Sequence, residues 1–191
     1  ILMGKLDENF PLVVWQTGSG TQTNMNLNEV LARRASELLS VSNQKREQIH
    51  PNDHCNLGQS SNDTYPTAMH IAALGKLRDD FIPAASSLHE TMRTKAHEFS
   101  DVVKIGRTHS MDATPMTLGQ EFDTFAEQIS KNLERVNAAS RFLLEVPQGG
   151  TAVGTGLNTP EGWDQKIVSE IANLSGLELS PAKSKFEHMS S

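Results

Sequence analysis

Two long runs of apolar residues at helical spacing constrain the fold of this chain more than any other feature. The first run extends over residues 63–99 and the second over residues 118–143, and in each an apolar side chain recurs every three or four residues. A helix with one apolar stripe cannot bury that stripe alone, so the two helices are expected to pack side by side in a bundle. Pro83 lies inside the first run and predicts a kink rather than an end, because the stripe resumes beyond it.

Shorter patterns complete an all-α fold, a long-helix bundle with short β-prone pieces in its loops. Apolar spacing predicts a helix after Thr21, and Thr117 with Gln120 forms a capping box at the start of the second long run. The stretch "DVVKIGRTH" is β-prone. A further helix is expected from Glu161 to Leu174, with inward side chains at Trp163, Ile167, Ile171 and Leu174.

Composition excludes several classes of partner. The 191 residues are 37% hydrophobic and 21% charged, which is ordinary for a soluble protein. Seventeen basic and twenty-three acidic residues give a net charge of -6, so we expect no nucleic-acid partner. We also expect no membrane partner, because no apolar run approaches the roughly 20 residues that span a bilayer. The single cysteine, Cys55, fits a reducing compartment and argues against a thiolate metal site.

Four polar loops interrupt the helices and are the places where chemistry is expected: residues 18–24, 50–64, 107–114 and 149–159. In the second loop Asp63 or Thr64 is the expected N-cap of the first long helix, with Pro66 in its first turn. The helix N-terminus, together with Ser60, Ser61 and Asn62, would form a neutral cradle for a carboxylate or phosphate. The alternative is an ordinary capped loop.

The third loop, "GRTHSMDATP", carries a candidate proton-transfer residue. His109 lies beside Arg107 and Thr108, and histidine exchanges a proton near neutral pH. The alternative is a structural histidine at the end of a strand.

Cofactor and metal patterns are weak. The stretches "GSGTQT" and "GTGLNT" lack the third glycine and the βαβ context of a dinucleotide site, so their glycines are expected to provide positive φ and close backbone approach. His50, Asp53 and His54 are close in sequence, but their spacing fits no zinc or calcium site. We expect neither a metal nor a cofactor.

Taken together, the sequence motifs of the loops are specific enough to indicate a protein family. The blocks "TGSGTQTNMNLNE", "HPNDH", "QSSNDTYPTAMH", "GRTHSMDATPMTLGQEF" and "GGTAVGTGLNT" occur in an order and at spacings that closely resemble class II fumarases, within the fumarase/aspartase superfamily. The resemblance covers essentially the whole chain. "WQTGSGTQ" and "QSSND" are similar to the fumarase forms rather than the aspartase forms, which favours water over ammonia as the added molecule.

The resemblance implies reversible hydration of fumarate to L-malate in the tricarboxylic acid cycle, without a cofactor. It implies His109 as the catalytic residue. The residues that would bind the dicarboxylate substrate are Ser19, Gly20, Thr21, Ser60, Ser61, Asn62 and Thr108. An accessory dicarboxylate site would include His50, Pro51, Asn52 and Asp53.

The resemblance also implies a homotetramer whose active sites are shared between subunits, in the cytoplasm or, alternatively, the mitochondrial matrix. Residues 1–62 would be the remainder of an N-terminal domain with substrate-binding loops, and residues 63–191 the first part of the central helical-bundle domain. The chain would then be an internal fragment, inactive alone, because the family's carboxyl-terminal part carries the catalytic base. Aspartate ammonia-lyase and a non-catalytic helical scaffold are the alternative functions.

Overall fold

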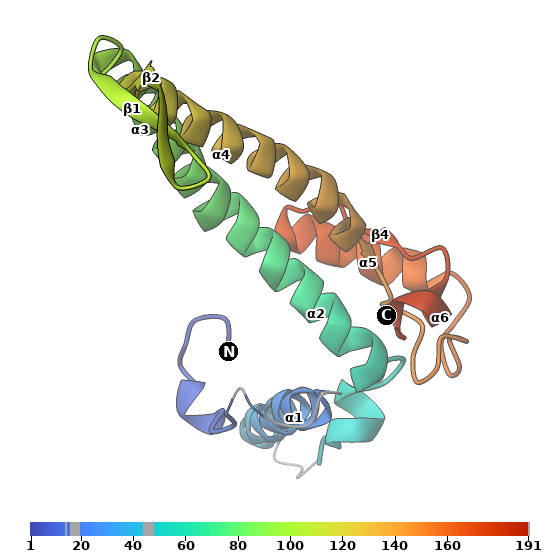
Figure 1. Ribbon diagram of the computed structural model, residues 1–191. Helices are drawn as coiled ribbons and strands as arrows, with labels where there is room; N and C mark the ends of the chain where they lie inside the picture. Colours follow the sequence, from blue (N-terminus) through green and yellow to red (C-terminus); the bar gives the residue numbers. More distant parts are fainter. Residues whose placement is uncertain (14, 16–19, 44–47, 191) are drawn as a thin grey trace. The chain divides into compact units, whose positions relative to one another are not determined.

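The computed structural model describes residues 1–13, 15, 20–43 and 48–190 (Figure 1). The chain divides into two compact units. The first unit comprises Ile1–Ile71 and Leu144–Ser191, and the second comprises Ala72–Leu143. The elements are predominantly helical, which confirms the expected all-α fold. The division at residues 62 and 63 expected from the sequence concerns domains of a longer protein and stays a prediction.

The second unit is built on two long helices joined by a β-hairpin. Helix α3, Ile82–Glu98, and helix α4, Leu118–Ser140, lie side by side (Figure 1). The rings of Phe99 and Phe122 pack with their centroids 5.4 Å apart at the end where the helices meet the hairpin. Gly119 allows this approach, because a Cβ atom there would lie 2.4 Å from the carbonyl oxygen of Ala96. The predicted side-by-side packing of the two long helices is therefore confirmed.

The hairpin confirms the β-prone stretch and the capping box. Strands β1, Val103–Thr108, and β2, Met111–Thr117, pair antiparallel. The Thr117 side chain then accepts from the backbone N–H of Gln120, and the Gln120 side chain accepts from the backbone N–H of Thr117. This reciprocal pair satisfies donors that a helix N-terminus otherwise leaves without partners, so α4 begins directly after β2.

The first long run remains helical through Pro83. Helix α2, Ser61–Lys76, passes into a π-helical turn, η3, Leu77–Phe81, and then into α3. Pro83 lies at the first turn of α3 and has no N–H to donate to the carbonyl four residues earlier. The wider turn just before the proline accommodates that missing bond, since π-helical turns insert into α-helices as local irregularities.

The first unit holds one long helix and several short elements around a small core. Its helices are α1 (Thr21–Asn43), the beginning of α2, α5 (Trp163–Ser175) and α6 (Lys185–His188). Its short turns are the 3-10 turn η1 (Asp7–Asn9) and the π-helical turn η2 (Pro51–Cys55). Two short strands, β3 (Glu145–Val146) and β4 (Ser180–Pro181), pair parallel. The 3-10 turn η4, Arg141–Leu144, leads into β3. Val146 and Val168 are fully buried.

Two expectations for this unit need correction. Leu174 was expected to face inward, but 87% of it is exposed, and Val168 fills the buried position of α5 instead. Residues 21–24, expected to be part of a loop, instead form the first turn of α1. The helices predicted after Thr21 and near residues 161–174 are themselves confirmed. No helix in the described ranges combines the length and apolar character needed to cross a bilayer.

Candidate functional site

The first turns of two helices meet in the first unit. Thr21 is the first residue of α1 and Ser61 is the first residue of α2, and their hydroxyl oxygens are 3.2 Å apart. Each helix N-terminus carries a partial positive charge and presents backbone N–H groups. Two such ends with two hydroxyls form a neutral, donor-rich place that suits a carboxylate. We call Gly20, Thr21 and residues 60–62 the clamp.

Gly20 is required where the chain enters α1. Its φ is +67°, in the left-handed region that favours glycine. A Cβ atom on Gly20 would lie 2.2 Å from Cγ of Tyr65, so the ring of Tyr65 occupies the space that any side chain would need. The backbone of Gly20 also accepts from the N–H of Asn24 and closes the first turn of α1.

Gly20→Ala is therefore expected to destabilise the chain by about 3 kcal/mol, combining a strained φ with an overpacked contact. Gly75→Ala is the matched control: Gly75 lies inside α2 with nothing within 4 Å of its added Cβ, so this change should stabilise by about 1 kcal/mol. Urea unfolding followed by circular dichroism measures both. Equal unfolding midpoints for Gly20→Ala and the parent chain would show that glycine is not required at position 20.

The start of α2 lies earlier than the sequence predicted. The carbonyl oxygen of Ser60 accepts from the N–H of Thr64, and Ser60 Oγ accepts from the N–H of Asn62 at 3.2 Å. Ser60 is thus the N-cap, and the expected N-caps Asp63 and Thr64 lie inside the first turn. Pro66 consequently falls in the second turn, so its missing N–H removes an intrahelical bond.

Asp63 forms a buried link across the first unit. Its side chain is 0% exposed, and Oδ1 accepts from the N–H of Ser60 at 2.8 Å. Oδ2 accepts from the N–H groups of Gly149 and Thr151 at 3.0 and 2.8 Å. Burial raises the pKa of Asp63, while these backbone donors act in the opposite direction. The carboxylate joins the N-terminus of α2 to residues 86 and 88 positions later.

A second contact supports the same link. Asn62 Nδ2 donates to the carbonyl oxygen of Ala152 at 2.7 Å. We call residues 149–152 the anchor loop. The buried side chain of Gln148, which precedes it, donates to Thr64 Oγ1 at 3.3 Å. The anchor loop thus lies directly against the clamp.

An amide cluster fixes the 50–60 segment on α1. Nδ2 of Asn24 and Nδ2 of Asn28 both donate to Oδ1 of Asn56, at 3.2 and 3.1 Å. Asn24 and Asn28 are buried, and buried amides of this kind need partners. The cluster therefore sets the position of the segment that leads into the clamp.

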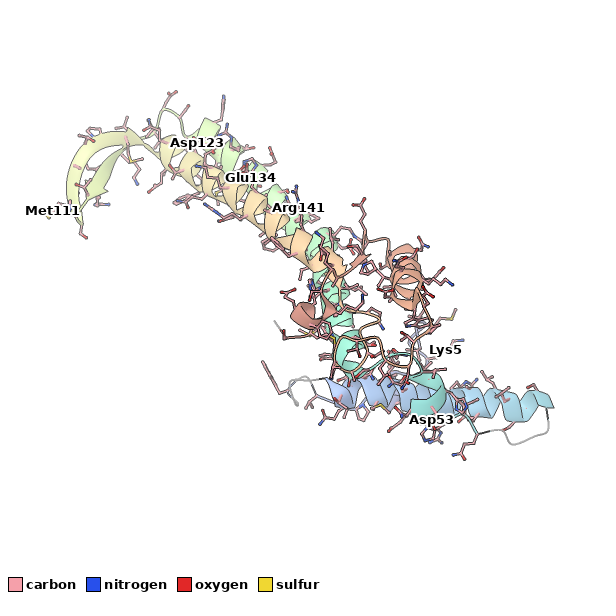
Figure 2. All side chains as sticks on the ribbon, turned by 90° about the vertical axis from the view of Figure 1, so that its right-hand side faces the viewer. Lys5, Asp53, Met111, Asp123, Glu134 and Arg141 are labelled. Carbon is pink, nitrogen blue, oxygen red and sulfur yellow. The ribbon has the colours of Figure 1, made fainter. Side chains whose placement is uncertain are left out.

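The expected accessory site forms a π-helical turn beside α1. His50 caps the turn: its Nδ1 accepts from the N–H of Asp53 at 3.1 Å and lies 3.2 Å from Asp53 Oδ2. Asn52 Nδ2 donates weakly to Asp53 Oδ1 at 3.4 Å, and Pro51 opens the turn. Asp53, labelled in Figure 2, is exposed on this turn. The residues are together, and their binding of a dicarboxylate stays a prediction.

His109 lies at the tip of the hairpin in the second unit. His109 and Ser110 connect β1 to β2 with φ of +54° and +61°, the pair of positive values found in a type I′ turn. Both are exposed, and Thr108 pairs with Met111 at the end of the ladder, where Figure 2 labels Met111. Histidine is among the residues that tolerate positive φ, so the turn presents the imidazole at an exposed position.

The structure thus brings together part of the predicted site. Gly20, Thr21 and residues 60–62 lie together in the first unit, whereas Thr108 and His109 belong to the second. Ser19 lies outside the described residues. The roles of all these residues in binding and catalysis stay predictions.

The sequence placed residues 149–159 among the candidate loops but did not indicate that the anchor loop lies against the clamp or that Asp63 links the two. A weak signal existed nearby, since the glycines of "GTGLNT" were predicted to have positive φ, and Gly154 and Gly156 do have it. The pairing of this loop with Asp63 had no signal, because the partners are far apart in sequence. Among the described residues no group of three His, Cys, Asp or Glu side chains is placed to hold a metal ion.

Comparison with known proteins identifies the family. A family model described as "Lyase" matches residues 1–191. The chain belongs to this lyase family. "Fumarate hydratase class II" from Nitrosomonas europaea is 56% identical over 98% of the lyase chain and 40% of its own length. "Fumarate hydratase 1, mitochondrial" from Arabidopsis thaliana is 55% identical over 96% of the chain and 37% of its own length.

Solved structures agree with this assignment. The crystal structure of recombinant class II fumarase from Schistosoma mansoni matches the lyase chain with a TM-score of 0.89 and 41% identity, covering 97% of this chain and 42% of that one. The resemblance to class II fumarases stated from sequence motifs is confirmed. The lyase chain spans about 40% of the length of the curated relatives it matches.

Proposed function

We propose that the complete gene product carrying this chain is a fumarate hydratase that interconverts fumarate and L-malate. The observation that carries the proposal is the high identity, across essentially the whole chain, to proteins named fumarate hydratase. The clamp supports it, because two helix N-termini and the hydroxyls of Thr21 and Ser61 suit a carboxylate group. The proposed reaction uses no cofactor.

The chemistry explains why such a clamp is useful. Removing a proton from the carbon beside a carboxylate places a second negative charge on that group, in the aci-acid form. Fixed donors where the charge develops stabilise the transition state, and one such donor is typically worth about 3 kcal/mol. In this proposal the backbone and side chains of the clamp hold the substrate, with Ser19 and Thr108 as further binding residues. His109 transfers a proton or activates water.

The assembly and compartment are part of the proposal. Phe81, Leu88 and Phe125 of the second unit are 48%, 47% and 43% exposed, and such apolar residues on long helices suit packing against other subunits. A homotetramer would allow loops from different subunits to complete one active site. The relatives support either the cytoplasm or the mitochondrial matrix, because both bacterial and mitochondrial proteins match.

The test is the ultraviolet absorbance of fumarate formed by the complete gene product. Supplied with L-malate, the protein is expected to form fumarate; supplied with L-aspartate, it is expected to form none. The 191-residue chain alone is expected to form none from either. Fumarate from aspartate would instead establish an ammonia-lyase, and no fumarate from either substrate would reject both enzymes in favour of a scaffold.

A further inference from the structure

Two neighbouring side chains at the start of α2 hold the anchor loop in different ways. Asn62 donates from Nδ2 to the carbonyl oxygen of Ala152, and Asp63 accepts from the N–H groups of Gly149 and Thr151. One helix turn therefore binds both a carbonyl and two N–H groups of the same short loop. Because Asp63 fixes the N–H groups that flank Gly150, the place of the Ala152 carbonyl depends on the Asp63 carboxylate.

The contact with Ala152 decides how the Asn62 amide is oriented. A carbonyl oxygen accepts only from the nitrogen end of an amide, so the bond selects one of the two flipped orientations of Asn62. Nδ2 carries two N–H groups, and Ala152 takes one of them. The other N–H is on the same atom and can donate to an anion. The flipped orientation would present Oδ1, which repels a carboxylate.

Two unfavourable features coincide at this link. Asp63 is a fully buried carboxylate whose pKa is raised by burial, so the folded chain holds a charge that is costly to bury. Thr151 is β-branched yet has a φ of +58°, a region where such residues are strained. Its Oγ1 is buried and has no hydrogen-bond partner within the described residues. Strain and buried charge that persist together point to a functional constraint.

We propose that Asp63 is a positioning residue for substrate binding: by holding the anchor loop it fixes the Ala152 carbonyl, which orients the Asn62 amide toward the substrate carboxylate. This inference rests on the proposed function and deepens it. Asp63 does not touch the substrate and acts through Asn62.

The first test is a double-mutant cycle on the complete gene product with Asp63→Asn and Asn62→Ala. The amide in Asp63→Asn has one acceptor oxygen where the carboxylate has two, because its nitrogen cannot accept. The variant therefore loses part of the hydrogen bonding that holds the anchor loop. If Asp63 acts through Asn62, Asp63→Asn raises KM for L-malate about tenfold with Asn62 present and less than about twofold in the Asn62→Ala protein. Equal effects in both backgrounds would overturn the proposal. Asp101→Asn, at an exposed aspartate, is the matched control and should leave KM unchanged.

A milder variant covers the case in which Asp63→Asn does not fold. Ala152 is exposed, and Ala152→Gly keeps the carbonyl while loosening the backbone that holds it. It is expected to raise KM about threefold, and only when Asn62 is present. The same effect in the Asn62→Ala background would contradict the coupling.

An independent readout separates this inference from the proposed function. In the 191-residue chain, nuclear magnetic resonance should show one Asn62 Nδ2 proton exchanging slowly with solvent, and Ala152→Gly should speed that exchange at least about threefold. The signal is assigned by its loss in Asn62→Asp. If the complete protein forms no fumarate from malate, the proposed function fails while this measurement still tests the link. Fast exchange in the parent chain would overturn the inference even in an active enzyme.

Discussion

His109→Asn in the complete gene product is expected to lower kcat for malate dehydration by a factor of about 10² to 10⁴. Asparagine cannot exchange a proton near neutral pH, and one positioned general acid or base typically contributes that factor. The folded turn should survive, because His109 has a φ of +54° and asparagine adopts positive φ readily. Steady-state kinetics with L-malate measures the effect, and unfolding midpoints check the fold.

The matched control is His97→Asn, at an exposed histidine near the end of α3. This variant should keep the parent kcat, since His97 has no place in the proposed mechanism. A His109→Asn protein with parent kcat would show that His109 is a structural turn residue, which is the alternative that the sequence left open.

Asp63→Ala is expected to destabilise the chain by about 4 kcal/mol. The change leaves the N–H groups of Ser60, Gly149 and Thr151 without their acceptor, and each buried unpaired donor costs about 1–3 kcal/mol. Asp63→Asn keeps one acceptor oxygen and should cost about half as much. Urea unfolding of the 191-residue chain measures both. The control Asp101→Ala should change stability by less than about 0.5 kcal/mol. A cost below about 1 kcal/mol for Asp63→Ala would refute the linking role of Asp63.

The cost of Asp63→Ala should also depend on pH. Burial raises the pKa of Asp63 above its ordinary value of 3.8. The folded state then holds this proton more tightly than the unfolded state, so the stability from the group is fully present below pH 3.8 and declines as the pH rises through the raised pKa. The difference between the parent chain and Asp63→Ala is therefore expected to be larger at about pH 4 than at about pH 7. An opposite trend would mean that the backbone donors outweigh burial.

The helical scaffold follows from local patterns in the amino-acid sequence. The stripes that include Phe99 and Phe122 repeat within one or two helix turns, and the capping box joins Thr117 to Gln120 only three residues later. Signals of this kind are local, so they can be recognised in a short window. The loop motifs also determined the family resemblance, because they occur in a specific order. Even here the exact start of α2 was wrong, since Ser60 and Asp63 are equally good capping residues by type.

The contacts that support the site, in contrast, depend on how distant parts of the chain pack together. Nothing near Asp63 in the sequence indicates that its carboxylate binds Gly149 and Thr151, which follow 86 and 88 residues later. Nor does the spacing of α5 show that Leu174 stays exposed, because burial depends on which elements pack against a helix face. Local patterns specify helices through contacts between near neighbours. The link at Asp63 instead depends on a fold that removes the carboxylate from water and supplies backbone N–H groups from a distant loop in its place.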